Sequence, residues 1–149
     1  MVSLGLLVIR LIVGSIFVIH GYAKVFGGPG KGAQVSPDAQ KLLGQGFVGQ
    51  MEQGGIANLT GFMSSLGLPN LRMQAVGLSA AELGGGLALI LGRRTRLAAL
   101  VLTYAQITAV RKIHGPHGLI APNGFETSAA LIAATAGLAL AGPGKIALN

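Results

Sequence analysis

The chain has 149 residues, of which 51% are hydrophobic and only 10% are charged. Soluble domains carry about 25% charged residues, so a water-soluble fold would have little charge for its surface, whereas a bilayer accepts apolar surface. The absence of cysteine excludes disulfides, thiol catalysis and thiolate metal sites. We assign the net charge of +7 to lysines and arginines that flank membrane helices and contact anionic lipid, not to nucleic-acid binding.

Four apolar stretches predict four transmembrane helices, at about residues 4–25, 71–91, 97–113 and 125–141. Lengths of roughly 17 to 22 residues match a hydrocarbon core about 30 Å thick at 1.5 Å per residue. The first stretch contains Arg10 and has no basic residue before it, which favours a retained helix over a cleaved signal peptide. We therefore expect an all-α fold, an integral membrane four-helix bundle that forms a single domain over residues 1–149.

Residues 27–70 form a long loop between the first two predicted helices. The run GGPG at 27–30 prevents the first helix from continuing, and Asp38 is suited to capping a short helix. Residues 56–66 predict a short helix in the membrane interface, because their large apolar side chains share one helical face. These side chains are Leu59, Phe62, Met63 and Leu66.

Small residues recur at spacings that let helices pack closely in a membrane. They are Gly14 and Gly21 in the first helix, Gly77, Ala81, Gly84 and Gly85 in the second, and Ala129, Ala133, Gly137 and Ala141 in the fourth. The densest basic cluster, Arg93, Arg94 and Arg96, lies in the shortest loop, which the positive-inside rule places in the cytoplasm. Both termini are then cytoplasmic, and Lys145 agrees with that topology.

Short motifs follow one another along nearly the whole chain. They are LVIRLIVG at 7–14, HGYAKVFG at 20–27, GF at 61–62, LGLP at 66–69, AELGGG at 81–86, Gly92, TRLAA at 95–99, His114, PNGFE at 122–126 and GPG at 142–144. In this order they resemble the DoxX family. The chain departs from the family pattern in the enlarged insertion at 27–55 and in Arg111 and Lys112. The resemblance implies a four-helix protein of the bacterial cytoplasmic (inner) membrane, linked to thiosulfate:quinone oxidoreduction, quinol oxidase subunits or oxidative-stress complexes.

Three polar side chains on three predicted helices lie at a similar depth. Counting 1.5 Å per residue places Arg10 about 9 Å, and Glu82 and Gln106 about 13 Å, from the inner edge. An unpaired charge at such depth costs at least about 2.5–3.5 kcal/mol. We therefore predict an Arg10–Glu82 ion pair, with Gln106 and Tyr104 completing its hydrogen bonds. This group is either a structural clamp between helices or a proton or quinone site.

A second polar group is expected near the outer edge of the bundle. It comprises His20, Lys24, Arg111, His114 and Glu126. One interpretation is a site for a quinone headgroup or an anion, in which His20 and Glu126 exchange protons. The other is that the cations extend to lipid headgroups. No metal site is predicted, and a haem or chlorin ligand role for His20 is a further alternative.

These features favour a membrane subunit of a quinone-linked oxidoreductase or respiratory-type assembly. The alternative is a purely structural accessory subunit of a larger membrane complex. A solute transporter fits less well, because no broken helix or inverted repeat is found. We assign no catalytic residue and leave open whether the chain is an enzyme. We expect no intrinsic cofactor, with quinone as the candidate ligand, and we expect membrane lipid and other membrane subunits as partners.

Overall fold

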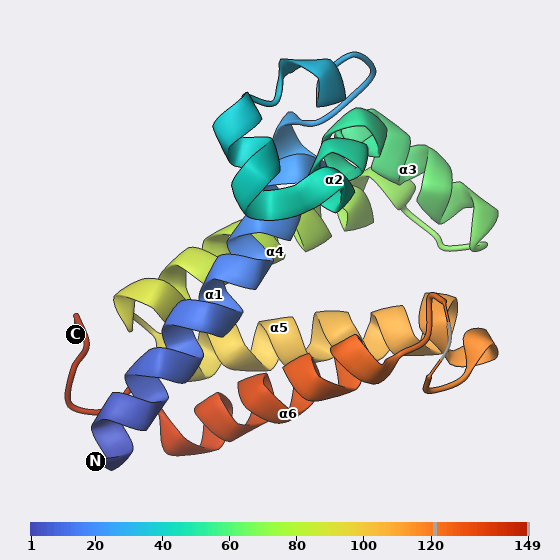
Figure 1. Cartoon of the computed structure of the whole chain (residues 1–149). Helices are drawn as coiled ribbons and strands as arrows, with labels where there is room; N and C mark the ends of the chain where they lie inside the picture. Colours follow the sequence, from blue (N-terminus) through green and yellow to red (C-terminus); the bar gives the residue numbers. More distant parts are fainter. Residues whose placement is uncertain (121, 149) are drawn as a thin grey trace. The chain divides into compact units, whose positions relative to one another are not determined.

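The computed structural model describes residues 1–120 and 122–148, and the regular secondary structure of these residues is all helical, with no strand. The α-helices are α1 (Val2–Phe26), α2 (Pro37–Gln53), α3 (Ile56–Ser65), α4 (Leu71–Leu91), α5 (Thr95–Ala109) and α6 (Glu126–Ala141) (Figure 1). Three short helical segments complete the chain: η1 (Gly32–Gln34), the π-helical turn η2 (Val110–His114) and η3 (Gly115–His117). The all-α prediction is confirmed.

The four predicted apolar stretches correspond to α1, α4, α5 and α6. In the described part of the chain, α1 and α4 are long and apolar enough to cross a membrane, whereas α6 is apolar but shorter. The third stretch ends differently from the prediction, because α5 stops at Ala109 and continues as the π-helical turn η2. Two candidate membrane spans are therefore found, and the bundle of four spans stays a prediction.

The predicted long loop between the first two membrane helices is wrong, because most of it is helical. Ser36 caps α2 by accepting a hydrogen bond from the Ala39 backbone N–H at 3.3 Å, so Ser36 and not Asp38 is the capping residue. Gly44 bends α2 with a positive φ of 79°, which a glycine adopts without strain. The short helix predicted at 56–66 is confirmed as α3.

The chain divides into two compact units. We call Met1–Phe17 with Gly84–Asn149 the terminal unit and Val18–Leu83 the central unit. Because α1 and α4 are long, each contributes a part of its length to each unit. The single domain expected over the whole chain stays a prediction.

In the terminal unit α5 and α6 run antiparallel, side by side (Figure 1). The apolar core beneath them comprises Val13, Phe17, Leu89, Ala98, Ala99, Leu102 and Leu138. The Thr103 hydroxyl donates to the Thr135 hydroxyl at 2.7 Å, which joins the two helices by a polar contact inside an apolar core. Glycines let the other helices approach, since a Cβ at Gly14 would lie 2.7 Å from the Ile90 side chain. The predicted packing role of Gly14 is thus confirmed.

Two of the predicted small-residue ridges are corrected by the packing. The buried side of α6 carries Ser128, Thr135 and Leu138, while Ala133 and Gly137 are exposed. On α4, a Cβ at Gly77 or Gly84 would meet nothing within 4 Å, whereas Gly85 lies against Leu102. The positions of small residues did not identify the packed faces of α4 and α6, because small residues also lie on the exposed faces of these two helices.

In the central unit the end of α1 is joined to the α2–α3 connection. The Ala23 carbonyl accepts hydrogen bonds from the Gly27 N–H at 2.9 Å and the Gly55 N–H at 3.1 Å. Gly54 approaches α1 so closely that a Cβ there would collide with that carbonyl. A Cβ at Gly21 would lie 2.5 Å from the Leu83 nitrogen, so the predicted role of Gly21 in close packing is also confirmed.

Candidate functional site

Arg10 is a buried cation whose hydrogen bonds go to backbone carbonyls of the terminal unit. Its side chain is 1% exposed. Nε donates to the Leu89 carbonyl at 2.9 Å, and Nη2 donates to the Ile90 carbonyl at 3.2 Å. Nη1 donates to the carbonyls of Pro143 at 2.5 Å and Ile146 at 2.7 Å. Since the first two carbonyls end α4, the guanidinium also complements the negative end of that helix.

Arg10 thereby fastens the C-terminal segment, residues 142–148, to the rest of the terminal unit. Gly92 makes room for it, because a Cβ there would lie 2.7 Å from Nη2 and its φ of +74° favours glycine. The Lys145 N–H donates to the Ser3 hydroxyl at 3.2 Å, and the Leu148 N–H donates to the Leu91 carbonyl at 3.0 Å. Of the two interpretations of Arg10, these contacts favour a structural clamp.

The predicted Arg10–Glu82 ion pair is not seen among the described residues, where Glu82 has another partner. Its Oε2 is paired with the Nζ of Lys24, which is the one ion pair in the part of the chain that the structure describes. The Glu82 side chain is 5% exposed and the Lys24 side chain 27%. Gln106 is half-buried on α5, and Tyr104 is 74% exposed, so the contacts expected of them are not seen in the described residues.

The close approach at Gly21 explains the actual pair. A Cβ at Gly21 would lie 3.0 Å from the Glu82 carbonyl carbon, so α1 and α4 nearly touch one turn before Lys24. Lys24 can therefore reach back to the Glu82 carboxylate. Depth counting missed this pair because it treated Lys24 as a residue of the membrane edge. The signal in the sequence is the spacing of a helix-contact glycine and a lysine three residues later.

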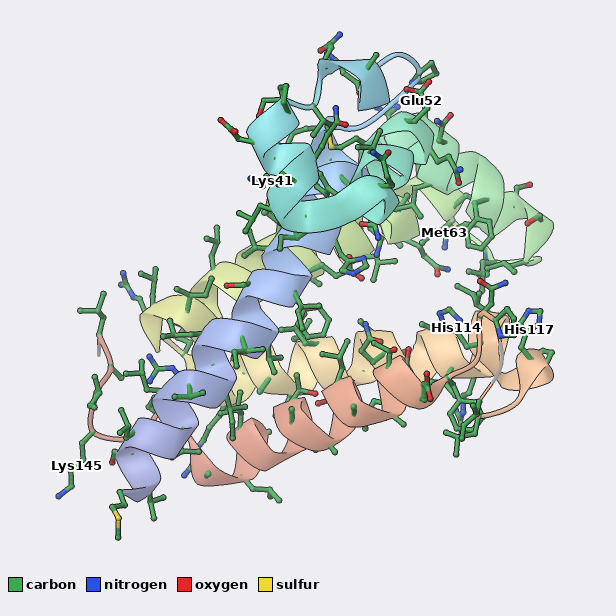
Figure 2. All side chains as sticks on the ribbon, in the orientation of Figure 1. Lys41, Glu52, Met63, His114, His117 and Lys145 are labelled. Carbon is green, nitrogen blue, oxygen red and sulfur yellow. The ribbon has the colours of Figure 1, made fainter. Side chains whose placement is uncertain are left out.

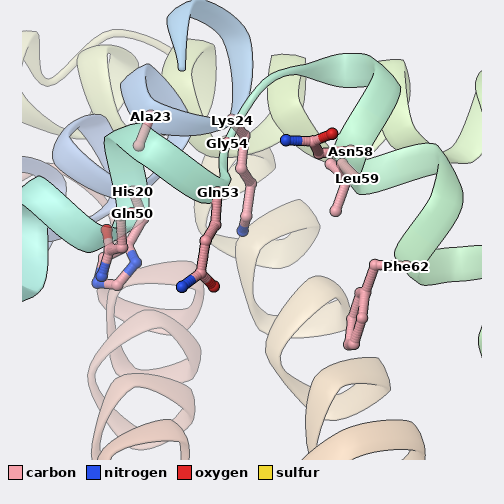
Figure 3. Close-up of a pocket in the computed structure, with 9 residues that line it drawn as sticks. All are labelled: His20, Ala23, Lys24, Gln50, Gln53, Gly54, Asn58, Leu59 and Phe62. Carbon is pink, nitrogen blue, oxygen red and sulfur yellow. The ribbon is translucent and has the colours of Figure 1, made fainter. Parts of the chain in front are cut away.

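A pocket of about 330 Å³ opens in the central unit, and Figure 3 shows the residues that line it. Helix α1 supplies His20, Ala23 and Lys24, the second half of α2 supplies Gln50 and Gln53, Gly54 follows, and α3 supplies Asn58, Leu59 and Phe62. His20 and Gln50 lie on one side, and Asn58, Leu59 and Phe62 on the other, with Gln53 and Lys24 between them (Figure 3). The pocket combines nitrogen donors with an aromatic ring and aliphatic surface.

The structure brings together two of the five residues predicted for the outer site, His20 and Lys24. The carboxamides of Gln50 and Gln53 were missed, because the segment that carries them was interpreted as a loop. Asn58 was missed although it lies in the short helix predicted at 56–66. Gln50 and Gln53 are three residues apart on one helix, so they share a face. That spacing was the available signal, and it has meaning only once α2 is recognised as a helix.

Arg111, His114 and Glu126, the other three residues of the predicted site, belong to the terminal unit and do not line this pocket. His114 Nδ1 lies 3.0 Å from the Asn123 carbonyl oxygen, and His114 and His117 lie near each other beyond α5 (Figure 2). Arg111 and Glu126 are exposed. Among residues 1–120 and 122–148, no three histidine, aspartate or glutamate side chains gather as metal ligands would.

Glu52 fastens the connection between α1 and α2. Its carboxylate accepts hydrogen bonds from the backbone N–H of Gly30 at 2.8 Å and of Gly32 at 3.0 Å (Figure 2 labels Glu52). These two bonds stabilise the charged carboxylate and hold the pKa of Glu52 below its ordinary value. Glu52 is on the same helix as Gln50 and Gln53, so it holds that helix to the segment that follows α1.

Comparison with known proteins gives one match. The DoxX family model matches residues 5–115, which include most of α1, all of α2 to α5, the Lys24–Glu82 pair and every residue of the pocket. The sequence matches no curated protein and no solved structure.

Proposed function

The chain belongs to the DoxX family, a membrane-associated family often linked to oxidoreductase systems, and on that premise we propose that it is the membrane subunit of a quinone-linked redox assembly. In this proposal the pocket of the central unit holds the quinone headgroup. The supporting observation is the set of donors around the pocket, contributed by His20, Lys24 and three carboxamides.

The residues of the pocket fit a quinone headgroup. A quinone has two carbonyl oxygens that accept hydrogen bonds, and the Lys24 ammonium and the carboxamides of Gln50 and Gln53 are donors. Phe62 and Leu59 offer apolar surface for the ring or the tail. The volume of about 330 Å³ lies at the lower end of the range for small-molecule pockets, about 300–1,000 Å³. A bound quinone supplies two-electron, two-proton redox chemistry.

His20 is the proposed proton-exchanging residue of the site. It is exposed on α1 near the end of that helix and also lines the pocket, so its imidazole is within reach of a ligand bound there. Imidazole changes charge near neutral pH, which suits proton exchange. Glu126, the other sequence candidate for this role, has no part in the proposal because it does not line the pocket.

We also propose that α1, α4, α5 with η2, and α6 cross the bacterial cytoplasmic membrane, with both termini in the cytoplasm. The exposed apolar side chains of α1 and α5, among them Leu4, Ile12, Leu97 and Leu100, support this because lipid covers such surface. The chain has no cysteine, so single cysteines can be introduced for labelling. Cysteines at Ser3 and Arg94 should react with an impermeant reagent from the same side of the membrane. Labelling from opposite sides would contradict this topology.

The quinone test measures retention of endogenous quinone after extraction in mild detergent. His20→Ala and Gln53→Leu should lower the quinone per protein several-fold, because each removes a donor from the pocket. His117→Ala is the matched control, an exposed histidine outside the pocket, and it should retain the wild-type amount.

The alternative function is a purely structural accessory subunit of a larger membrane complex. One observation favours it: Arg10, the most deeply buried charge, acts as a structural clamp. Unchanged quinone content in both pocket variants, or no quinone in the wild-type protein, would favour this alternative. The proteins that co-purify with the chain would then identify the complex.

A further inference from the structure

The charge balance around the pocket determines which chemical class of ligand it accepts. We propose that Glu82 makes the pocket electrically neutral and so restricts it to neutral ligands with carbonyl or hydroxyl oxygens, excluding small anions. This inference rests on the proposed ligand-binding role of the pocket. It makes Glu82, which does not line the pocket, the residue that determines ligand specificity.

Among the described residues that line the pocket, Lys24 is the one charged side chain. Without a partner, its ammonium would attract an anion such as sulfate. The carboxylate of Glu82 is bonded to that ammonium from outside the lining and is 5% exposed. Opposite charges in contact largely cancel beyond the pair, and a low-dielectric surrounding strengthens the pairing. The pocket therefore presents hydrogen-bond donors without a net positive charge.

The remaining polar groups of the pocket are neutral dipoles. Gln50, Gln53 and Asn58 carry carboxamides, and the imidazole of His20 is uncharged above its titration range. Such groups can donate to a carbonyl oxygen, but they do not balance a negative charge that has left water. Lysine has three N–H donors, so Lys24 can bond Glu82 and still donate to a ligand oxygen.

The two other acidic residues of the central unit do not take the place of Glu82. Glu52 is bonded to the backbone of Gly30 and Gly32, and Asp38 is exposed in the first turn of α2. Neither lines the pocket. Replacing Glu82 by glutamine keeps the shape and removes the negative charge, so the pocket should gain one net positive charge and become an anion site.

The experiment titrates purified full-length protein in detergent with two probes, sodium sulfate and a short-tailed neutral benzoquinone, at pH 8, where imidazole is uncharged. Binding is followed by calorimetry at constant ionic strength. Wild-type protein should bind the quinone and show no saturable sulfate binding. Glu82→Gln should bind sulfate at least tenfold more tightly than wild type, with quinone affinity within a few-fold. The double variant Lys24→Met/Glu82→Gln has no charge at the pair and should lose the sulfate binding again.

A second measurement needs no variant and keeps the test decisive if Glu82→Gln fails to fold. Wild-type protein should bind the neutral benzoquinone at least tenfold more tightly than the same ring carrying a carboxylate. Equal affinity for the two rings, saturable sulfate binding by wild type, or no gain of sulfate binding in folded Glu82→Gln would each overturn the inference. If the sulfate pattern holds but no quinone binds, the specificity role of Glu82 stands and the quinone function fails. If quinone binds but the sulfate pattern is absent, the quinone function stands and the specificity role of Glu82 fails.

Discussion

Helix α1 carries a buried or partly buried cation in each unit, and the two units stabilise these cations differently. In the terminal unit, Arg10 gives its donors to four backbone carbonyls, and its side chain has 1% exposure. In the central unit, Lys24 pairs with one carboxylate and remains 27% exposed at the edge of a pocket. The planar guanidinium suits several fixed acceptors, whereas the ammonium is a compact charge with three donors. The comparison associates Arg10 with stability and Lys24 with binding.

The largest expected effect comes from Arg10→Met. It would remove the side-chain donor from the carbonyls of Leu89, Ile90, Pro143 and Ile146, of which Leu89 keeps the Gly92 N–H. Each buried, unsatisfied polar group costs about 1–3 kcal/mol. We expect a loss of at least about 3 kcal/mol of stability in detergent and increased proteolysis of residues 142–148. Thermal unfolding and limited proteolysis measure these effects. Arg10→Lys keeps the charge but not the fork of donors, so it should recover only part of the loss. Wild-type stability of the Arg10→Met variant would contradict the structural role of Arg10.

Next in size is the coupling between Lys24 and Glu82. Lys24→Met leaves a carboxylate with 5% exposure unpaired, whereas Glu82→Gln leaves a lysine that already reaches the pocket. Lys24→Met should therefore destabilise the protein more than Glu82→Gln does. A double-mutant cycle should give a coupling energy of roughly 0.5–3 kcal/mol. In a second double-mutant cycle, between Arg10 and Glu82, the effects of the two substitutions on stability should be additive. Strong coupling in that cycle would support the ion pair predicted from the sequence.

The third comparison concerns close helix packing. It introduces a methyl group, by Gly→Ala, at one glycine in tight contact with a neighbouring helix and at another with open space around it. At Gly21 the Cβ would lie 2.5 Å from the Leu83 nitrogen, whereas at Gly84 it would meet nothing within 4 Å. Gly21→Ala should cost about 1–3 kcal/mol through overpacking and separate Lys24 from Glu82. Gly84→Ala should be neutral or slightly stabilising, since alanine favours helix. Equal stability of the two variants in thermal unfolding would contradict the packing of α1 on α4 in the central unit.

The smallest expected effect is the pH dependence of the Glu52 contacts. The two N–H donors lower the pKa of Glu52, so the unfolded chain binds a proton at this residue more readily than the folded one. The stabilising contribution is therefore present above the ordinary glutamate pKa of about 4.3 and is lost as the pH falls through the lowered folded value. Hydrogen exchange of the Gly30 and Gly32 amides should lose protection in that acidic range. In Glu52→Gln the protection should be weaker and should not change with pH there.

How far the sequence was informative differs between the helices and their contacts. The apolar runs located α1, α4 and α6 to within about two residues, because a 20-residue apolar segment has few alternatives to a helix. The long insertion was misjudged, since its glycines are typical of loops, yet Gly44 merely bends α2. Arg10 and Glu82 were recognised as charges in need of partners, but the structure gives each of them a partner that was not predicted. Acceptors on a chain end, such as those of Arg10, cannot be inferred from periodicity.

By itself the sequence determined the helical fold, the apolar character of α1 and α4, the DoxX family and the two polar positions of α1 that line a pocket, His20 and Lys24. Only the tertiary structure decided that Arg10 holds the C-terminal segment, that Lys24 pairs with Glu82, and that carboxamides from α2 and α3 complete the pocket. The physical reason is one of range. Helix formation and hydrophobicity are properties of neighbouring residues, whereas the partner of a buried charge depends on which distant backbone reaches it, as the glycines at 21, 54 and 92 allow.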